Sequence, residues 1–310
     1  MRRGLLAFAV LLLSWGAAQG QQLDFARAVQ GNEEKLSYRW RDSAMREHLT
    51  SFSLSRRDVA DAEASFREFS LAGMWGAIEA DLRAETASFG NGARIDFTRE
   101  RNRLMWTASA RDAGAQAALI HRLNERFERA QKAYLSRHLR KRTEEGRILI
   151  DFAAATTFQE GPLRGVSRAL AGTPGIGADE RARVALALAF FQQIPYVGLG
   201  DGEARGSDFL AGPAVLARNR GDCDSKAVAL AAVLRTYVPV RKLVAVSMPG
   251  HVVLGIDLPA LPGDRTVRTA TGQYVIIEAA GPHLSAIGNV DGRTAKYLAD
   301  PRQIEIWPLN

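Results

Sequence analysis

The spacing of apolar and polar residues divides the chain into two parts that order their elements differently. In the first part, stretches of alternating apolar and polar residues, typical of strands, are interrupted by stretches whose apolar residues recur every three or four positions, typical of helices. The predicted strands are residues 35–42, 47–55, 93–100 and 102–109, and the predicted helices are residues 58–89 and a segment that starts at 112. This order predicts a mixed α+β region.

The second part begins near Gly146 and places its helices before its strands. Helical spacing covers residues 148–158, 161–172, 180–194 and a segment after Cys223, and strand-like runs cover residues 241–248, 250–258 and 272–279. Gly, Pro and Asp lie between the predicted strands, where they favour turns. Helices followed by strands with short connections indicate an α+β fold with an antiparallel sheet.

The N-terminus has the layout of a secretory signal peptide. Arg2 and Arg3 precede the apolar run LLAFAVLLL, and small residues follow, with a predicted cleavage after Gly20. The run is shorter than the roughly 20 apolar residues that a membrane-spanning helix needs, so an uncut anchor is the less favoured alternative. We expect a signal peptide at 1–20, an accessory region at 21–145, a main domain at 146–310, and a periplasmic or secreted bacterial protein.

Positive charge is moderate in the predicted mature chain and is concentrated in one segment. Removal of Arg2 and Arg3 takes the net charge from +7 to +5, with 39 basic and 34 acidic residues. Residues 122–142 carry many of the positive charges, interspersed with acids on a helical pattern. The solvated face of a long amphipathic helix explains them, and contact with an anionic envelope surface is the alternative. We find no nucleic-acid recognition motif and expect no nucleic-acid partner.

Cys223 is the single cysteine of the chain, so it cannot form an intramolecular disulfide. It lies in the motif GDCDSKA, and the apolar residues Leu230 and Leu234 follow it on one face of a predicted helix. Gly221 or Asp222 can cap this helix, which places Cys223 in a first turn where free N–H groups and the helix dipole favour a thiolate. The thiol is therefore a candidate nucleophile, with a buried structural cysteine as the alternative.

A cysteine nucleophile needs a base and a group that orients the base. Among the histidines, His251 stands out because it follows a turn and opens a predicted strand. Asp257 on the same strand is roughly 20 Å away at about 3.3 Å per residue, which is out of reach. Glu278 ends the next predicted strand, so antiparallel pairing of the two strands would make it a neighbour of His251.

The motifs GDCDSKA, GHVVL and YVIIEAAGP, in this order, resemble those of the bacterial transglutaminase-like cysteine peptidase group of the papain-like superfamily. Two upstream pieces, ALAFFQQIPYV and FLAGPAVLARNR, are also similar to that group. The resemblance covers residues 147–290, about half of the chain. It implies an α+β core in which the nucleophile helix packs on an antiparallel sheet. Many relatives have Asp where this chain has Glu278.

The resemblance implies a role for each matched residue. The roles are those of the nucleophile Cys223, the base His251, the orienting acid Glu278 and the oxyanion-hole donor Gln192, which would act with the Cys223 N–H. Some members of the group bind calcium through acids beside the nucleophile, which implies a calcium site at Asp222 and Asp224. Asp222 as a helix cap and Asp224 as a first-turn acid are the alternative, and no cofactor is then required.

Three functions remain open at this point. The leading hypothesis is an exported cysteine hydrolase that cleaves peptide or isopeptide bonds in protein or peptide substrates of the cell envelope. A transglutaminase that crosslinks proteins would use the same acyl-enzyme and resolve it with an amine. A binding or scaffold protein that retains the fold would need none of the three catalytic residues.

Overall fold

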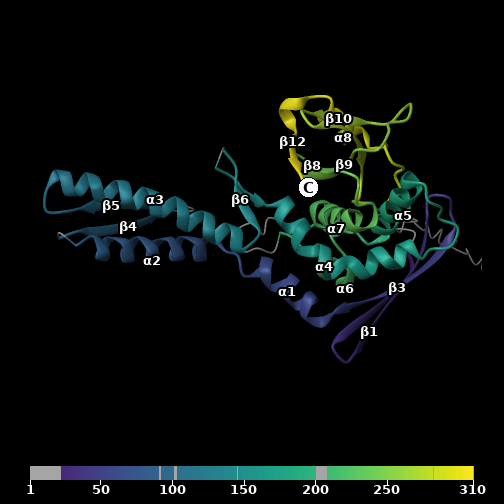
Figure 1. Cartoon of the computed structure of the whole chain (residues 1–310), viewed down its shortest axis with the longest axis horizontal. Coiled ribbons are helices and arrows are strands. Elements are labelled where there is room, and N and C mark those ends of the chain that lie inside the picture. The colour runs from purple at the N-terminus through teal and green to yellow at the C-terminus, as the bar shows by residue number, and fades with distance from the viewer. Residues whose placement is uncertain are drawn as a thin grey trace, which may run out of the picture.

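The computed structural model describes residues 22–90, 92–100, 103–144, 146–199, 208–281 and 283–309 (Figure 1). The predicted signal peptide lies outside these residues. Within the described residues, helices and four sheets build the fold, and every strand pair of these sheets is antiparallel. The expected α+β class is therefore confirmed.

The N-terminal strands form a meander that packs against the main body of the protein. The sheet has the order β1 (Gln22–Gln30), β2 (Glu33–Arg41) and β3 (Glu47–Ser55). Alternate residues of β2 are buried, among them Tyr38 and Trp40, and their rings contact Phe190 of a core helix. The period-two pattern of β2 thus turns one face of this sheet toward the core.

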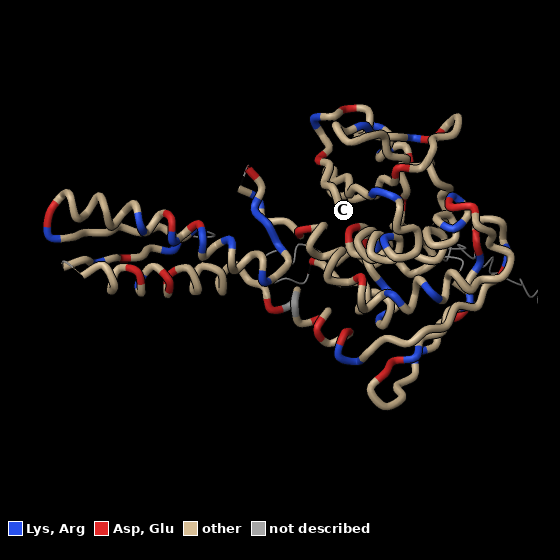
Figure 2. Tube along the Cα trace, viewed as in Figure 1, with Lys and Arg blue, Asp and Glu red and all other residues tan. Residues whose placement is uncertain are grey.

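A long extension, which we call the arm, projects from the body on the left of Figure 1. After α1 (Arg56–Arg67), it is built from α2 (Leu71–Phe89), β4 (Arg94–Glu100), β5 (Arg103–Ser109) and α3 (Ala113–Arg137). The single helix expected over 58–89 is two helices, because Ser70 starts α2 by accepting a hydrogen bond from the Gly73 N–H. The long basic helix is present as α3 but ends at Arg137, so residues 140–142 of the basic segment leave it and form a strand. Figure 2 shows positive and negative residues interspersed along the arm.

The chain returns from the arm through a short hairpin and enters a group of helices. The hairpin consists of β6 (Arg140–Arg142) and β7 (Ile148–Ile150), and the helices are α4 (Phe152–Ala171), α5 (Glu180–Gln193), α6 (Gly212–Arg218) and α7 (Cys223–Tyr237). Side chains on all sides of α7 are buried, from Ser225 to Leu234. A helix that is apolar all round is enclosed by other elements, and here α4, α5, α6 and the sheet enclose α7.

The C-terminal region forms a five-stranded antiparallel sheet with the order β10-β11-β9-β8-β12. Its strands are β8 (Leu243–Met248), β9 (His251–Ile256), β10 (Thr266–Thr269), β11 (Gly272–Ile277) and β12 (Glu305–Pro308), with α8 (Gly292–Leu298) and a 3-10 helix (Pro301–Gln303) before β12. The predicted pairing of β9 with β11 is confirmed, with Ile277 opposite Leu254. One face of this sheet packs on α7.

The hydrophobic clusters do not separate at residues 145 and 146, where we expected the boundary between the accessory region and the main domain. One cluster joins the β1–β3 sheet and α1 to the helices and the sheet of the second part. A separate, smaller cluster fills the arm and includes Ile78, Leu82 and Leu119. The described residues include no helix that is long and apolar enough to cross a membrane.

Candidate active site

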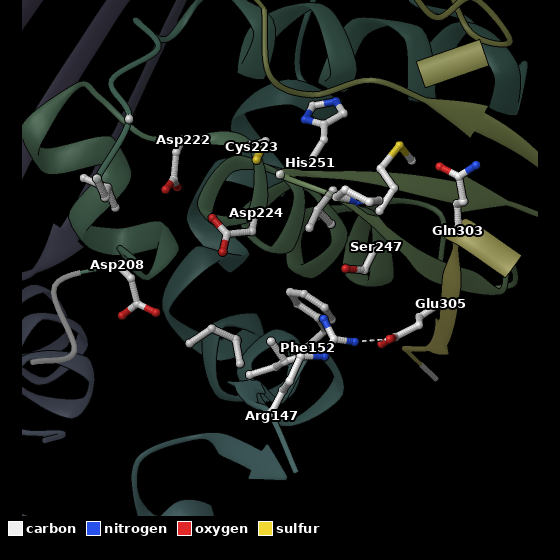
Figure 3. Close-up of a pocket in the computed structure, with 18 of the residues that line it drawn as sticks. Arg147, Phe152, Asp208, Asp222, Cys223, Asp224, Ser247, His251, Gln303 and Glu305 are labelled. Atoms are coloured by element: carbon white, nitrogen blue, oxygen red, sulfur yellow. Dashed lines mark hydrogen bonds and ion pairs between the residues drawn. The ribbon is translucent and has the colours of Figure 1, made fainter. Parts of the chain in front are cut away.

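Cys223 is the first residue of α7, and local sequence places it there. The Asp222 side chain caps the helix by accepting a hydrogen bond from the Ser225 N–H at 3.3 Å, as expected from the motif. The buried apolar residues behind it hold α7 in place. Cys223 is partly exposed and lines a cleft of about 740 Å³ (Figure 3). The thiol therefore sits at the positive end of a rigid helix and is open to a substrate.

His251 faces the cleft because a tight turn joins β8 to β9. Pro249 and Gly250 form the turn between the paired residues Met248 and His251. Gly250 has φ +71, which suits the position after proline in a type II turn. The turn makes His251 the first residue of β9, at the rim of the cleft beside Cys223.

Glu278 holds His251 from the neighbouring strand, as the strand order predicts. The distance between His251 Nε2 and Glu278 Oε2 is 2.6 Å. The other carboxylate oxygen of Glu278 accepts a hydrogen bond from the Ala280 N–H at 2.9 Å, so both oxygens of the carboxylate are held in place. Burial lowers the pKa of His251, but hydrogen bonds to Cys223 and Glu278 and the charges of both residues outweigh it and raise the pKa to about 10.

The structure thus brings together three of the four predicted catalytic residues, namely Cys223, His251 and Glu278. Because Glu278 engages Nε2 of His251, Nδ1 is the ring nitrogen that remains available to a partner in the cleft. A protonated imidazole between a sulfur and a carboxylate stabilises negative charge on both sides. Such an arrangement is suited to hold a thiolate–imidazolium pair.

Gln192 takes a different position from the expected one. Its side-chain amide nitrogen donates hydrogen bonds to the backbone carbonyls of Glu278, at 2.7 Å, and Ser285, at 3.0 Å. Both amide hydrogens are thus used, and Gln192 is not among the described residues that line the cleft of Cys223. The expected oxyanion donor is corrected to a residue that holds the loop after β11. Gly281 in this loop has φ +64, and a Cβ there would lie 2.4 Å from the Gln192 carbonyl oxygen.

Lys226, three residues after Cys223 on α7, also holds this loop in place. Its side chain is fully buried, and Nζ donates to the carbonyls of Ile194, at 2.8 Å, and Ala280. Burial lowers the pKa of Lys226 to about 7, although the charges of Glu278, Asp222 and Cys223 oppose this shift. Lysine is almost never fully buried, so sequence reasoning missed this residue even though it lies within GDCDSKA.

Tyr196 is a second residue that sequence reasoning missed. It lines the cleft, is 46% exposed, and belongs to the same QQIPYV stretch as Gln192. A backbone bridge between Tyr196 and Gly221 holds it beside Cys223, with hydrogen bonds from Val197 N to Gly221 O and from Gly221 N to Pro195 O. Burial and the charges of nearby groups, Cys223 first among them, raise the pKa of Tyr196, so its hydroxyl stays a hydrogen-bond donor.

Asp222 and Asp224 form a carboxyl pair next to the thiol. Burial, followed by the charge of Asp222 and a hydrogen bond to its side chain, raises the pKa of Asp224 well above the ordinary value. Calcium takes six to eight oxygen ligands, and within the described residues no cluster of three or more acids, histidines and cysteines surrounds this pair. The calcium site at Asp222 and Asp224 therefore stays a prediction, and no catalytic step is derived through calcium.

The remaining walls of the cleft come from elements distant in sequence. Arg147 to Ile150 and Phe152 form one side, and the β8–β9 turn forms another (Figure 3). At one end, an ion pair joins Arg147 to Glu305 of β12. Asp208 also lines the cleft, and Arg140 neutralises it through two hydrogen bonds. The cleft is thus open above the thiol and has both polar and apolar walls.

Comparisons with protein-family models, with curated proteins and with solved structures each found no match for this chain.

Proposed function

We propose that this protein is an exported cysteine-dependent acyl-transfer enzyme, a peptidase or amidase resembling the transglutaminase-like cysteine peptidases. One observation carries the proposal: the Cys223 thiol lies at a helix start in an open cleft, and His251, which is hydrogen-bonded to Glu278, lines the same cleft. A structural cysteine has no use for a charged imidazole that a buried carboxylate holds in the same cleft. Perturbed titratable groups that converge in a cleft are the usual sign of a catalytic centre.

The chemistry follows from the order of these groups. The Cys223 thiolate attacks an amide carbonyl carbon, a C–S bond forms, and the negative charge moves to the carbonyl oxygen. The Cys223 N–H and the Tyr196 hydroxyl are the donors that this cleft offers to that oxygen. The C–N bond then breaks as His251 gives its proton to the leaving nitrogen, which leaves a thioester on Cys223.

Water completes the hydrolytic reaction. Neutral His251 takes a proton from water, the oxygen attacks the thioester carbonyl, and the C–S bond breaks to release the acid and the thiolate. A primary amine in place of water would give the crosslinked product of a transglutaminase from the same thioester. Mass analysis of the products with and without an added amine, dansylcadaverine, distinguishes these two outcomes.

The proposal is tested by the reactivity of the single thiol. We would measure alkylation of Cys223 by iodoacetamide from pH 5 to 9 by intact mass in wild type, His251→Ala and, as control, His121→Ala. His121 is an exposed residue of the arm. Since a cysteine without an activating partner is only a few per cent thiolate near neutral pH, His251→Ala is expected to slow labelling roughly tenfold or more there. The control should label at the wild-type rate.

Equal labelling rates and profiles in wild type and His251→Ala would contradict the proposal and favour a binding or scaffold protein. Glu278→Gln keeps the shape of the side chain but removes its charge, so it is expected to fall between wild type and His251→Ala. Export is tested separately, by the N-terminal sequence of the protein recovered from the periplasm or medium. A mature chain starting near Gln21 would support it, and recovery of the unprocessed chain in the cytoplasm would contradict it.

A further inference from the structure

The β6–β7 hairpin leaves one of its edges open. Hydrogen bonds from Thr143 N to Arg147 O and from Asp151 N to Leu139 O mark two hydrogen-bonded pairs at its ends. The register pairs Lys141 with Leu149 and Arg142 with Ile148. In an antiparallel ladder, hydrogen-bonded and non-hydrogen-bonded pairs alternate, so Leu149 bonds inward to β6. The N–H and C=O groups of Ile148 and Ile150 therefore point away from β6.

This open edge faces the candidate catalytic cleft. Four consecutive residues, Arg147 to Ile150, line the cleft of Cys223. Successive side chains of a strand point to opposite faces, so side chains alone would not put four neighbours on one wall. The backbone edge of β7 therefore contributes to this wall. Ile148 also lines a second cavity at the base of the arm, which is consistent with its side chain and its backbone facing different spaces.

Within the described residues, no strand pairs with this edge. β6 and β7 form a two-stranded sheet of their own. The opposite sides of the cleft carry Cys223, His251 and Tyr196, and the 3-10 helix and β12 contribute Gln303 and Glu305, respectively. An exposed strand edge is a ready template for another chain, and a paired strand lies about 4.8 Å away. The outward groups of Ile148 and Ile150 are two residues apart, roughly 6.6 Å, which matches the repeat of an extended chain. Ile148 is partly exposed, and Ile150, although only 4% exposed, still lines the cleft.

We propose that the acyl-donor substrate is an extended polypeptide segment that adds a strand to the open edge of β7. The inference rests on the proposed function, since it places the carbonyl of that segment at Cys223. The Ile148 N–H donates to a substrate carbonyl and the Ile148 carbonyl accepts a substrate N–H, and Ile150 repeats the pattern. Recognition through main-chain groups tolerates many sequences but requires an unfolded or extended stretch. Helical and compact substrates are therefore excluded.

The test compares two probes that alkylate the same thiol. Acetyl-tetraalanyl chloromethyl ketone carries four backbone amides, and chloroacetamide carries no peptide; in both, a C–S bond to Cys223 forms and chloride leaves. The readout is the ratio of their second-order rate constants, peptide over non-peptide. Ile148→Pro removes the outward N–H without removing a ladder hydrogen bond, as proline on a strand edge does. We expect the ratio to fall about three- to tenfold, the effect of losing one hydrogen bond.

Two further measurements keep the test independent of whether Ile148→Pro folds normally. Ile148→Val keeps the backbone N–H, so its ratio of peptide to non-peptide rate constants is expected to equal that of wild type. In wild type, probes methylated at single amide nitrogens should react slowly at every second position, because only alternate amides of a paired strand face β7. A period of two in this series supports the proposal.

The proposal is overturned if the peptide probe has no advantage in wild type, or if the N-methyl series shows no alternation. These outcomes differ from a failure of the proposed function. If the proposed function fails, iodoacetamide labels wild type and His251→Ala at the same rate, whatever the result with the peptide probes. Normal dependence on His251 combined with a flat N-methyl series would keep the catalytic centre and remove β7 from substrate binding.

Discussion

The arm and the main body use the same kinds of elements but hold them together differently. In the arm, two helices cover a two-stranded hairpin, and only one side of each helix is buried. Its surface carries ion pairs such as Arg83–Glu79 and Arg126–Asp81. In the body, α7 is buried on all sides, and its buried Lys226 donates to backbone carbonyls. Surface ion pairs stabilise little, so the arm depends on its narrow apolar core.

The difference explains why the candidate site lies in the body. Catalysis needs groups held within tenths of an ångström, and close packing around each group provides this. Glu278, Lys226 and Gln192 fix one loop through hydrogen bonds from three elements. The exposed, ion-paired surface of the arm suits contact with a partner or an anionic surface, as expected for residues 122–142, and that contact stays a prediction.

The largest effect we predict separates the two hydrophobic clusters. Leu119 in the arm and Leu230 on α7 are both fully buried. Truncation of either to alanine is expected to lower the free energy of unfolding by about 2–5 kcal/mol. Leu119→Ala should speed hydrogen exchange over residues 71–137 and leave iodoacetamide labelling of Cys223 unchanged. Leu230→Ala should change both exchange and labelling in the body. Slower labelling of Cys223 in Leu119→Ala would show that the arm supports the site.

The next prediction concerns the pH dependence of stability and two residues of the body whose pKa values shift in opposite directions. His251 has its pKa raised from 6.5 to about 10, so its contribution to stability is complete below pH 6.5 and is lost as the pH rises toward 10. Lys226 has its pKa lowered from 10.5 to about 7, so the folded state binds fewer protons than the unfolded state between these values. Its contribution therefore makes stability increase as the pH rises from 7 to 10.5.

Thermal unfolding between pH 7 and 10 tests this opposition. Relative to wild type, Lys226→Met should lose stability more steeply as the pH rises, and His251→Gln should lose it less steeply or gain it. The exposed Lys296→Met on α8 serves as the control and should follow the wild-type profile. Parallel curves for all four proteins would mean that neither residue has the shifted pKa.

The smallest effect we predict is at the surface of the arm. Glu79 accepts hydrogen bonds from Arg83 and Arg99, and all three side chains are at least partly exposed. Glu79→Ala is expected to lower the free energy of unfolding by about 0.2–1 kcal/mol, less at high salt, as measured by urea unfolding. A loss comparable to that of Leu119→Ala would mean that ion pairs, rather than the apolar cluster, hold the arm together.

Local sequence was sufficient for the parts of the site that depend on neighbours along the chain. Asp222 as a cap and Cys223 in a first turn follow from GDCDSKA, because a helix start needs a short side chain that accepts its free N–H groups. The strands β9 and β11, and their antiparallel pairing, follow from apolar runs separated by turn residues. This pairing was enough to predict that Glu278 lies beside His251.

The tertiary structure alone decided the rest, because those features depend on contacts between distant segments. The sequence does not specify which way the Gln192 side chain points at the end of a helix buried on every side; the loop after β11 determines it by offering two carbonyls. From the sequence alone, Lys226 is expected to be solvated; only the packing of α5 and β11 around it makes it buried. Tyr196 reaches Cys223 only through its bridge to Gly221, and the edge of β7 reaches the cleft only because the chain returns from the arm. Periodicity along the chain records which residues are buried, but the identity of their partners is a property of the folded protein.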